Sequence, residues 1–96
     1  MSKVYFSCFR DVAKAHGSAI QSPADYIGTV ELSVGSSSSR IQLPEGTNHC
    51  EIEAKADAFV LFGNELVTAT SGARPISEGV TKFYSPKETH VAVIQQ

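Results

Sequence analysis

The stretch HCEIEAK, residues 49–55, decides the fold class of this chain. Apolar and polar residues alternate along it, with Cys50, Ile52 and Ala54 on one side and two glutamates and a lysine on the other. Successive side chains of a β-strand point to opposite faces, so a period of two is typical of a strand with one buried face. We therefore predict a strand at 49–55 whose glutamates face water.

Further stretches with a period of two lie on both sides of this strand, separated by turn residues such as glycine, proline and serine. Short strands with a turn roughly every 8–12 residues are typical of sandwiches and barrels. We predict one all-β domain over 1–96, a small antiparallel β-sandwich or barrel of about seven or eight short strands with little helix. The other expected strands are 4–9, 26–34, 40–43, 58–62, 65–70, 80–84 and 89–95.

The sequence also predicts the conformation of the segments that connect these strands. Gly63 and Asn64 are predicted to form a hairpin turn that leads into the return strand 65–70, because both residues accept left-handed backbone conformations. Residues 71–75 are expected to form a loop. The tract GSSSS, residues 35–39, is interpreted as a flexible loop between two strands. Residues 11–16 are predicted to form one helical turn or a loop.

The composition limits the classes of partner. A hydrophobic fraction of 42% and a charged fraction of 19% fit a globular protein. The net charge of -2 provides no basic field for phosphates, so we do not expect a nucleic-acid partner. The basic residues are interpreted as scattered solubilising charges, at Arg10, Lys14, Arg40, Arg74, Lys82 and Lys87.

No membrane partner is expected either. The longest apolar run is Ala58–Phe62, whereas a membrane helix needs about 20 such residues. The amino end, MSKVYFSCFRD, is too short in apolar residues for a secretory signal. We expect the chain to be made and kept in the cytosol, or to be part of something assembled there.

The cysteines and histidines do not predict a metal site. The available donors are Cys8, His16, His49, Cys50 and His90, and no two of them have the spacing that places two ligands on one turn. His49 and Cys50 are adjacent, so on a strand they point to opposite faces. We expect Cys8 and Cys50 to be free, buried thiols rather than a disulfide.

No cluster of residues predicts catalysis. The sequence has no G-x-S-x-G motif and no glycine-rich phosphate loop. Glu51 and Glu53 share a strand face as a carboxylate pair would, but the opposite face is the apolar one, so we expect both to be solvated. We therefore predict no enzyme, with no catalytic, cofactor-binding or metal-binding residue.

The order of motifs between Ile41 and Ile94 resembles that of small virion proteins of tailed bacteriophages. The motifs are IQLPEG at 41–46, ADAFVLFG at 56–63, VTATSG at 67–72, PISEGV at 75–80 and HVAVI at 90–94. The family comprises β-sandwich accessory proteins, often described as decoration or cement proteins. The resemblance covers a little over half of the chain, and the amino half contributes nothing to it.

This resemblance implies a non-enzymatic structural protein that binds and stabilises the virion shell in many copies. The implied partners are the major capsid protein or other virion proteins, together with further copies of the chain, a trimer being favoured. The implied location is the virion, assembled in the cytoplasm of the host bacterium. The capsid surface, the head-to-tail junction and the tail are all compatible positions.

The alternative is a carbohydrate- or receptor-binding module, because β-sandwiches commonly carry binding sites and the serine-rich loop has hydroxyls that could bond sugars. The sequence gives it little support, since it has no tryptophan and its tyrosines lie on three separate predicted strands. In its predicted strand, Tyr26 is expected to share a face with Gly28, Val30, Leu32 and Val34.

The last predicted strand is apolar on both faces. Along 89–95, Val91 and Val93 point one way while Ala92 and Ile94 point the other. A sandwich core covers only one of these pairs, so the other needs a second cover. Residues 10–25 could fold back over it, or neighbouring copies or the capsid surface could supply the cover. We expect the latter, because uncovered apolar rows on sheets favour association.

Overall fold

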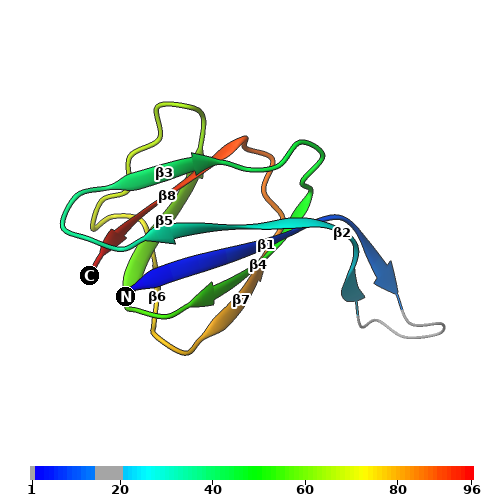
Figure 1. The fold of residues 1–96 in the computed structure, drawn as a ribbon, viewed down its shortest axis with the longest axis horizontal. Coiled ribbons are helices and arrows are strands. Elements are labelled where there is room, and N and C mark those ends of the chain that lie inside the picture. The colour runs from blue at the N-terminus through cyan, green and yellow to red at the C-terminus, as the bar shows by residue number, and fades with distance from the viewer. Residues whose placement is uncertain (1, 15–20) are drawn as a thin grey trace.

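The computed structural model describes residues 2–14 and 21–96, and within them the chain forms eight strands and no helix (Figure 1). This confirms the prediction of an all-β fold. The strands are β1 (Lys3–Lys14), β2 (Gln21–Ser33), β3 (Ser39–Gln42), β4 (His49–Ala54), β5 (Ala58–Gly63), β6 (Arg74–Ile76), β7 (Thr81–Tyr84) and β8 (His90–Gln95).

The strands form two four-stranded antiparallel sheets that pack as a sandwich. One sheet has the order β2-β1-β4-β7 and the other β3-β8-β5-β6. Alternate residues of both sheets build one core, as the period of two predicts. Its fully buried members include Val4, Phe6, Cys8, Cys50, Ala54, Val91 and Val93.

The first hairpin is longer than predicted. Asp11 pairs with Ala24 and Lys14 with Gln21, so residues 11–14 continue β1 and the prediction of a helical turn or loop is wrong there. Residues 15 and 16 of that prediction lie outside the described residues. Figure 1 shows this end of the hairpin projecting beyond the sandwich, and we call residues 10–14 and 21–25 the arm.

A register shift between Cys8 and Phe9 of β1 turns Tyr26 of β2 to the outer face of the sheet. Before the shift Cys8 pairs with Gly28, and after it Phe9 pairs with Tyr26, which leaves Ile27 without an opposite residue. Such a bulge reverses the alternation on the strand that contains the extra residue. Tyr26 therefore lies with Phe9 on the outer face, 59% exposed, and the prediction that it shares a face with Leu32 is wrong.

The segment after β5 does not return as a strand. Residues 65–70 lie outside both sheets, and the strand that next pairs with β5 is β6, residues 74–76, which overlaps the end of the predicted loop 71–75. The Asn64 side chain accepts a hydrogen bond from the Leu66 backbone N–H at 2.8 Å, and the Asn64 carbonyl accepts one from Val67 at 3.0 Å. Neither Gly63 nor Asn64 has a positive φ, so the expected left-handed hairpin turn is also wrong.

This segment covers the second face of β8. Val67 and Ala69 are buried, and they form a small cluster with Ala92, against which Ile94 packs. The cover thus comes from the same chain, from Val67 and Ala69. The expectation that neighbouring copies or a capsid supply this cover is therefore wrong.

The serine tract after β2 is bonded to the sandwich at both ends. The Gly35 carbonyl accepts a hydrogen bond from the Gln95 N–H at 3.0 Å, and Ser38 Oγ accepts one from the Ala69 N–H at 2.8 Å. Ser39 is already paired with Val93 as the first residue of β3. Residues 35–38 form the connection between β2 and β3, as predicted, and only Ser39 belongs to a strand; Ser36 and Ser37 are the exposed residues of the tract.

Candidate functional site

The two cysteines are neighbours across β1 and β4. Cys8 and Cys50 are register partners, both are fully buried, and their Sγ atoms lie 3.9 Å apart as free thiols. The hydrogen bond with Cys8 and burial raise the pKa of the Cys50 thiol. The same hydrogen bond lowers the pKa of the Cys8 thiol to about 7, but both side chains are fully buried, so a reagent in solution reaches neither sulfur in the folded protein.

The described histidines lie apart from the thiols. His49 is on the outer face and its Nδ1 is 2.8 Å from Ser85 Oγ, while His90 Nδ1 is 2.8 Å from Thr89 Oγ1. His16 lies outside the described residues. Among the described residues no group of three or more His, Cys, Asp and Glu side chains is placed to hold a metal ion.

The glutamates of β4 lie on the outer face, as predicted. Glu53 forms a salt bridge with Lys55 at 2.6 Å, and its side chain is 46% exposed. Glu51 is opposite Ser7 on one side and Phe83 on the other. Within the described part of the chain, no helix is long and apolar enough to cross a membrane.

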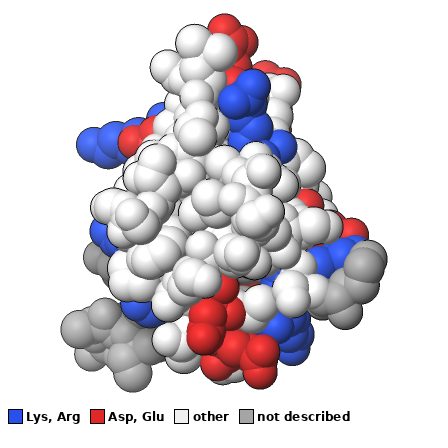
Figure 2. All heavy atoms as spheres, turned by 90° about the vertical axis from the view of Figure 1, so that its left-hand side faces the viewer, with Lys and Arg blue, Asp and Glu red and all other residues white. Residues whose placement is uncertain are grey.

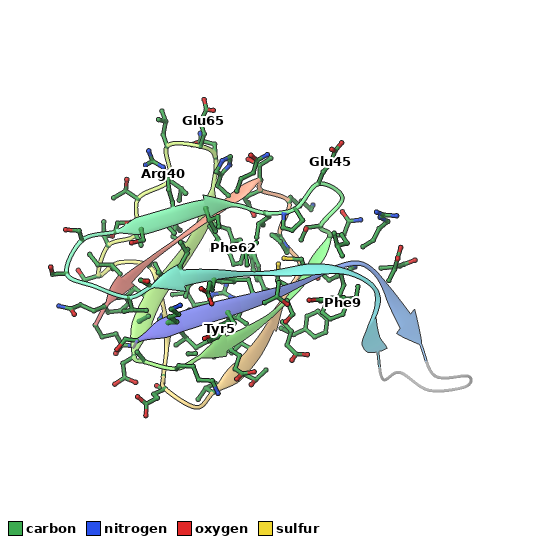
Figure 3. The ribbon with its side chains drawn as sticks, in the orientation of Figure 1. Tyr5, Phe9, Arg40, Glu45, Phe62 and Glu65 are labelled. Carbon is green, nitrogen blue, oxygen red and sulfur yellow. The ribbon has the colours of Figure 1, made fainter. Side chains whose placement is uncertain are left out.

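Aromatic side chains gather on the outer face of the β2-β1-β4-β7 sheet. The rings of Tyr26 and Phe9 are 5.5 Å apart, Phe9 is opposite His49, and the rings of His49 and Phe83 are 6.3 Å apart. These four residues, one from each strand, form what we call the aromatic row. Figure 3 shows Phe9 near the arm and Tyr5 further back along β1. Tyr26 and Phe83 are 59% and 45% exposed, so the row is open to a partner.

Polar groups border the aromatic row on the same face. Thr29 Oγ1 lies 2.6 Å from the Tyr26 hydroxyl and 3.3 Å from Ser7 Oγ. One row further along, Lys3 donates to Glu31 at 2.8 Å. Sequence patterns did not reveal this surface, because Tyr26 reaches it only through the bulge and His49 was considered solely as a metal ligand.

The centre of one end of the sandwich is uncharged. Figure 2 shows the end that lies at the left of Figure 1, with lysine, arginine and acidic side chains at the rim and uncharged residues across the centre. The segments 35–39 and 67–73 have no charged residue, and the bond from Ala69 to Ser38 joins them. The centre of this end therefore offers hydroxyl groups, while the charged side chains lie around its rim.

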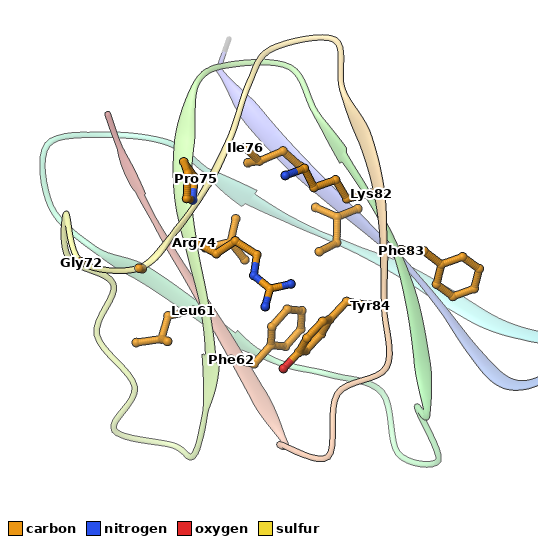
Figure 4. Close-up of a pocket in the computed structure, with 12 residues that line it drawn as sticks. Leu61, Phe62, Gly72, Arg74, Pro75, Ile76, Lys82, Phe83 and Tyr84 are labelled. Carbon is orange, nitrogen blue, oxygen red and sulfur yellow. The ribbon is translucent and has the colours of Figure 1, made fainter.

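A pocket of about 310 Å³ opens between β6 and β7, the last strands of the two sheets (Figure 4). Core residues Ile52, Val60 and Ile76 line its inner part. Figure 4 shows Arg74, Lys82 and Tyr84 reaching into the space between the two strands, while Phe83 projects from the other side of β7. The sandwich is therefore open along this side.

Aromatic rings pack against the positively charged Arg74 side chain at the mouth of the pocket. The Arg74 guanidinium lies 5.1 Å from the centre of the Tyr84 ring, and Tyr84 stacks on Phe62 with ring centres 4.6 Å apart. The ion pairs of the described residues involve neither Arg74 nor Lys82. Sequence analysis had treated both as solubilising charges, and only the pairing of the strands brings them to one pocket.

No known protein family, curated protein or solved structure matches this chain.

Proposed function

We propose that this chain is a non-enzymatic structural protein of a tailed-phage virion, of the decoration or cement type, which binds shell proteins in many copies. The arm is the observation that carries the proposal. Beyond the pair Phe9 and His49, β1 has only β2 beside it, so the arm is a two-stranded ribbon with no third strand among the described residues. Figure 1 shows it extending away from both sheets.

A two-stranded ribbon is at best marginally stable in water by itself. The base of this one is held in place, because Asn48 Nδ2 donates to the Arg10 carbonyl at 2.9 Å and Arg10 pairs with Asp25 at 3.6 Å. Its far part gains stability when it lies on a neighbouring protein. Arms of this kind suit multi-copy shells, because each copy can grip the next one or the lattice beneath it.

The partners proposed are the major capsid protein or other virion proteins, in a virion assembled in the bacterial cytoplasm. A homo-oligomer, with a trimer favoured, stays part of the proposal through the resemblance and the arm. It no longer has support from β8, whose second face is covered by Val67 and Ala69. The head-to-tail junction and the tail suit an arm as well as the capsid surface does.

Removing the arm tests the proposal. Residues 12–23 are replaced by Asn-Gly, a pair suited to a two-residue hairpin turn between Asp11 and Ala24. The shells used are those of the phage whose portal, scaffold or major capsid genes lie beside the gene for this chain. We expect wild type to co-sediment saturably with shells, and the shortened variant to stay folded but lose binding. Saturable binding by both proteins would show that the arm is not the contact, and binding by neither would reject the proposal.

The aromatic row favours a second candidate function, carbohydrate or receptor binding. Aromatic faces pack on the apolar faces of sugar rings, while nearby hydroxyl and carboxylate groups bond sugar hydroxyls. Thr29, Ser7 and Glu51 supply such groups beside the row. A glycan array separates the candidates: glycan binding by wild type that Phe83→Ala abolishes, without binding to shells, would favour the second.

A further inference from the structure

We infer that the pocket between β6 and β7 is a docking site for an extended acidic peptide segment of a partner protein, which adds as a strand to β7. The segment would place one apolar side chain in the pocket and a carboxylate, two residues away, on Arg74. This site is separate from the arm and does not depend on the virion proposal.

The free edge of β7 provides the backbone part of this site. β7 has β4 on one side and no strand on the other among the described residues. The Ala54 N–H donates to the Val80 carbonyl at 3.3 Å, so by the alternation of an antiparallel ladder Lys82 and Tyr84 also bond toward β4. The peptide groups of Thr81 and Phe83 then point to the free edge, where an added strand can pair with them.

The pocket provides the apolar part. Alternate side chains of a strand added to β7 point to the same side as Ile52 and Lys82, which is the side on which the pocket lies. Phe62 and Tyr84 form its aromatic wall. A cavity of about 310 Å³ is at the small end of ligand sites, so it suits one anchoring side chain better than a large free ligand.

The charge at the mouth selects an acidic segment. The Arg74 guanidinium lies over the Tyr84 ring, and this ring contact occupies none of its N–H groups in a described ion pair, so they can donate to a carboxylate in the two-bond geometry that arginine favours. Lys82 adds a second positive charge, and the described ion pairs give neither residue an acidic partner. Residues i and i+2 of a strand share a face, so an apolar residue and an acid at that spacing meet both features.

A displayed library of random peptides is the probe, selected on the full-length protein and then on two variants. Arg74→Gln removes the guanidinium at the pocket. Arg40→Gln is the matched control, because Arg40 is on β3 at the opposite edge of the same sheet. We expect enriched peptides with an apolar residue two positions from an acid, and affinity about tenfold to a hundredfold weaker for Arg74→Gln. Arg40→Gln should bind as wild type does.

Three results would overturn the inference. The first is that no peptide is enriched above the background seen with Arg74→Gln. The second is that the enriched peptides lack acids or bind both variants equally. The third is that benzoate, used alone as a small aromatic anion, shifts the NMR signals of Tyr84 and Arg74 while no peptide does, which would assign the pocket to a small molecule. Amide spectra of each variant verify the fold, so loss of binding through unfolding is recognised.

Discussion

A Cβ atom on Gly63 would lie 2.8 Å from both Cβ and Cγ2 of Val67, closer than carbon atoms pack. This approach lets the chain leave β5 and turn back so that Val67 reaches the outer face of β8. Gly63→Ala should therefore destabilise the protein by about 1–3 kcal/mol, because one of the two residues must move. Urea unfolding measures the effect.

Gly28→Ala is the control for this substitution. Gly28 is also a strand glycine without a positive φ, and a Cβ there meets nothing within 4 Å. Its replacement should leave the unfolding midpoint nearly unchanged. Equal effects at the two positions would mean that residues 64–69 are not held against β8.

Ser38→Ala should cost about 1–3 kcal/mol, since it leaves the N–H of the buried Ala69 without its acceptor. Ser37→Ala is the matched control, because that serine is exposed and donates or accepts no described side-chain hydrogen bond. Thermal unfolding of both variants checks the expectation. If Ser38→Ala unfolds at the same temperature as wild type, the hydrogen bond from Ala69 to Ser38 does not stabilise the fold.

The period of two was enough to predict the core, because inward residues such as Phe6 and Ile52 repeat at every second position of their strands. It failed at residues 64–76. There Val67 and Ala69 also alternate with polar residues, yet they bury against Ala92 as an irregular segment. An alternating pattern indicates which side chains are buried. Both a strand and an irregular segment that lies on a sheet can produce this pattern.

The aromatic row and the β6–β7 pocket depend on which strands pair and in which register, and no local sequence pattern predicts this. The position of Tyr26 in the aromatic row follows from one extra residue opposite β1, and a bulge has no sequence signal as strong as a turn's. Arg74 contacts Tyr84 because β6 is an edge strand of one sheet and β7 is an edge strand of the other. Strand order is decided by the whole chain, so these contacts required the structure.

The thiols of Cys8 and Cys50 should resist modification in the folded protein. Both are fully buried, and burial together with the shared hydrogen bond disfavours the Cys50 thiolate. Iodoacetamide at about pH 8, near the ordinary thiol pKa, should label both only in denaturant. Intact mass follows the reaction. Rapid labelling under native conditions, or a mass two hydrogens lighter, would contradict free, shielded thiols.

Replacing both cysteines by alanine should cost a few kcal/mol at most, roughly the loss of buried sulfur contacts. Because no bridge joins Cys8 to Cys50, the same cost is expected with and without reductant. Urea unfolding in the two conditions provides the comparison, and a cost that appears only without reductant would indicate a disulfide.

Two single substitutions on β8, Val93→Asp and Ile94→Asp, should distinguish the contribution of the core from that of the segment that covers the outer face of β8. Val93 is fully buried in the core between the sheets, so Val93→Asp should unfold the domain, because an unpaired buried charge costs several kcal/mol of a total near 5–15. Ile94 is partly buried and packs against the small cluster of Val67, Ala69 and Ala92, outside the core between the sheets. Ile94→Asp should cost roughly 1–3 kcal/mol and leave both sheets folded.

The same pair tests where the protein associates. Light scattering and shell co-sedimentation of Ile94→Asp should match wild type, because the face that it alters lies under residues of its own chain and the proposed contact is the arm. Leu61→Asp is the control, since Leu61 lies opposite Ala92 on the same face but is 40% exposed. A folded Ile94→Asp that no longer associates, beside a Leu61→Asp that does, would show that the cover opens and that β8 is a contact surface after all.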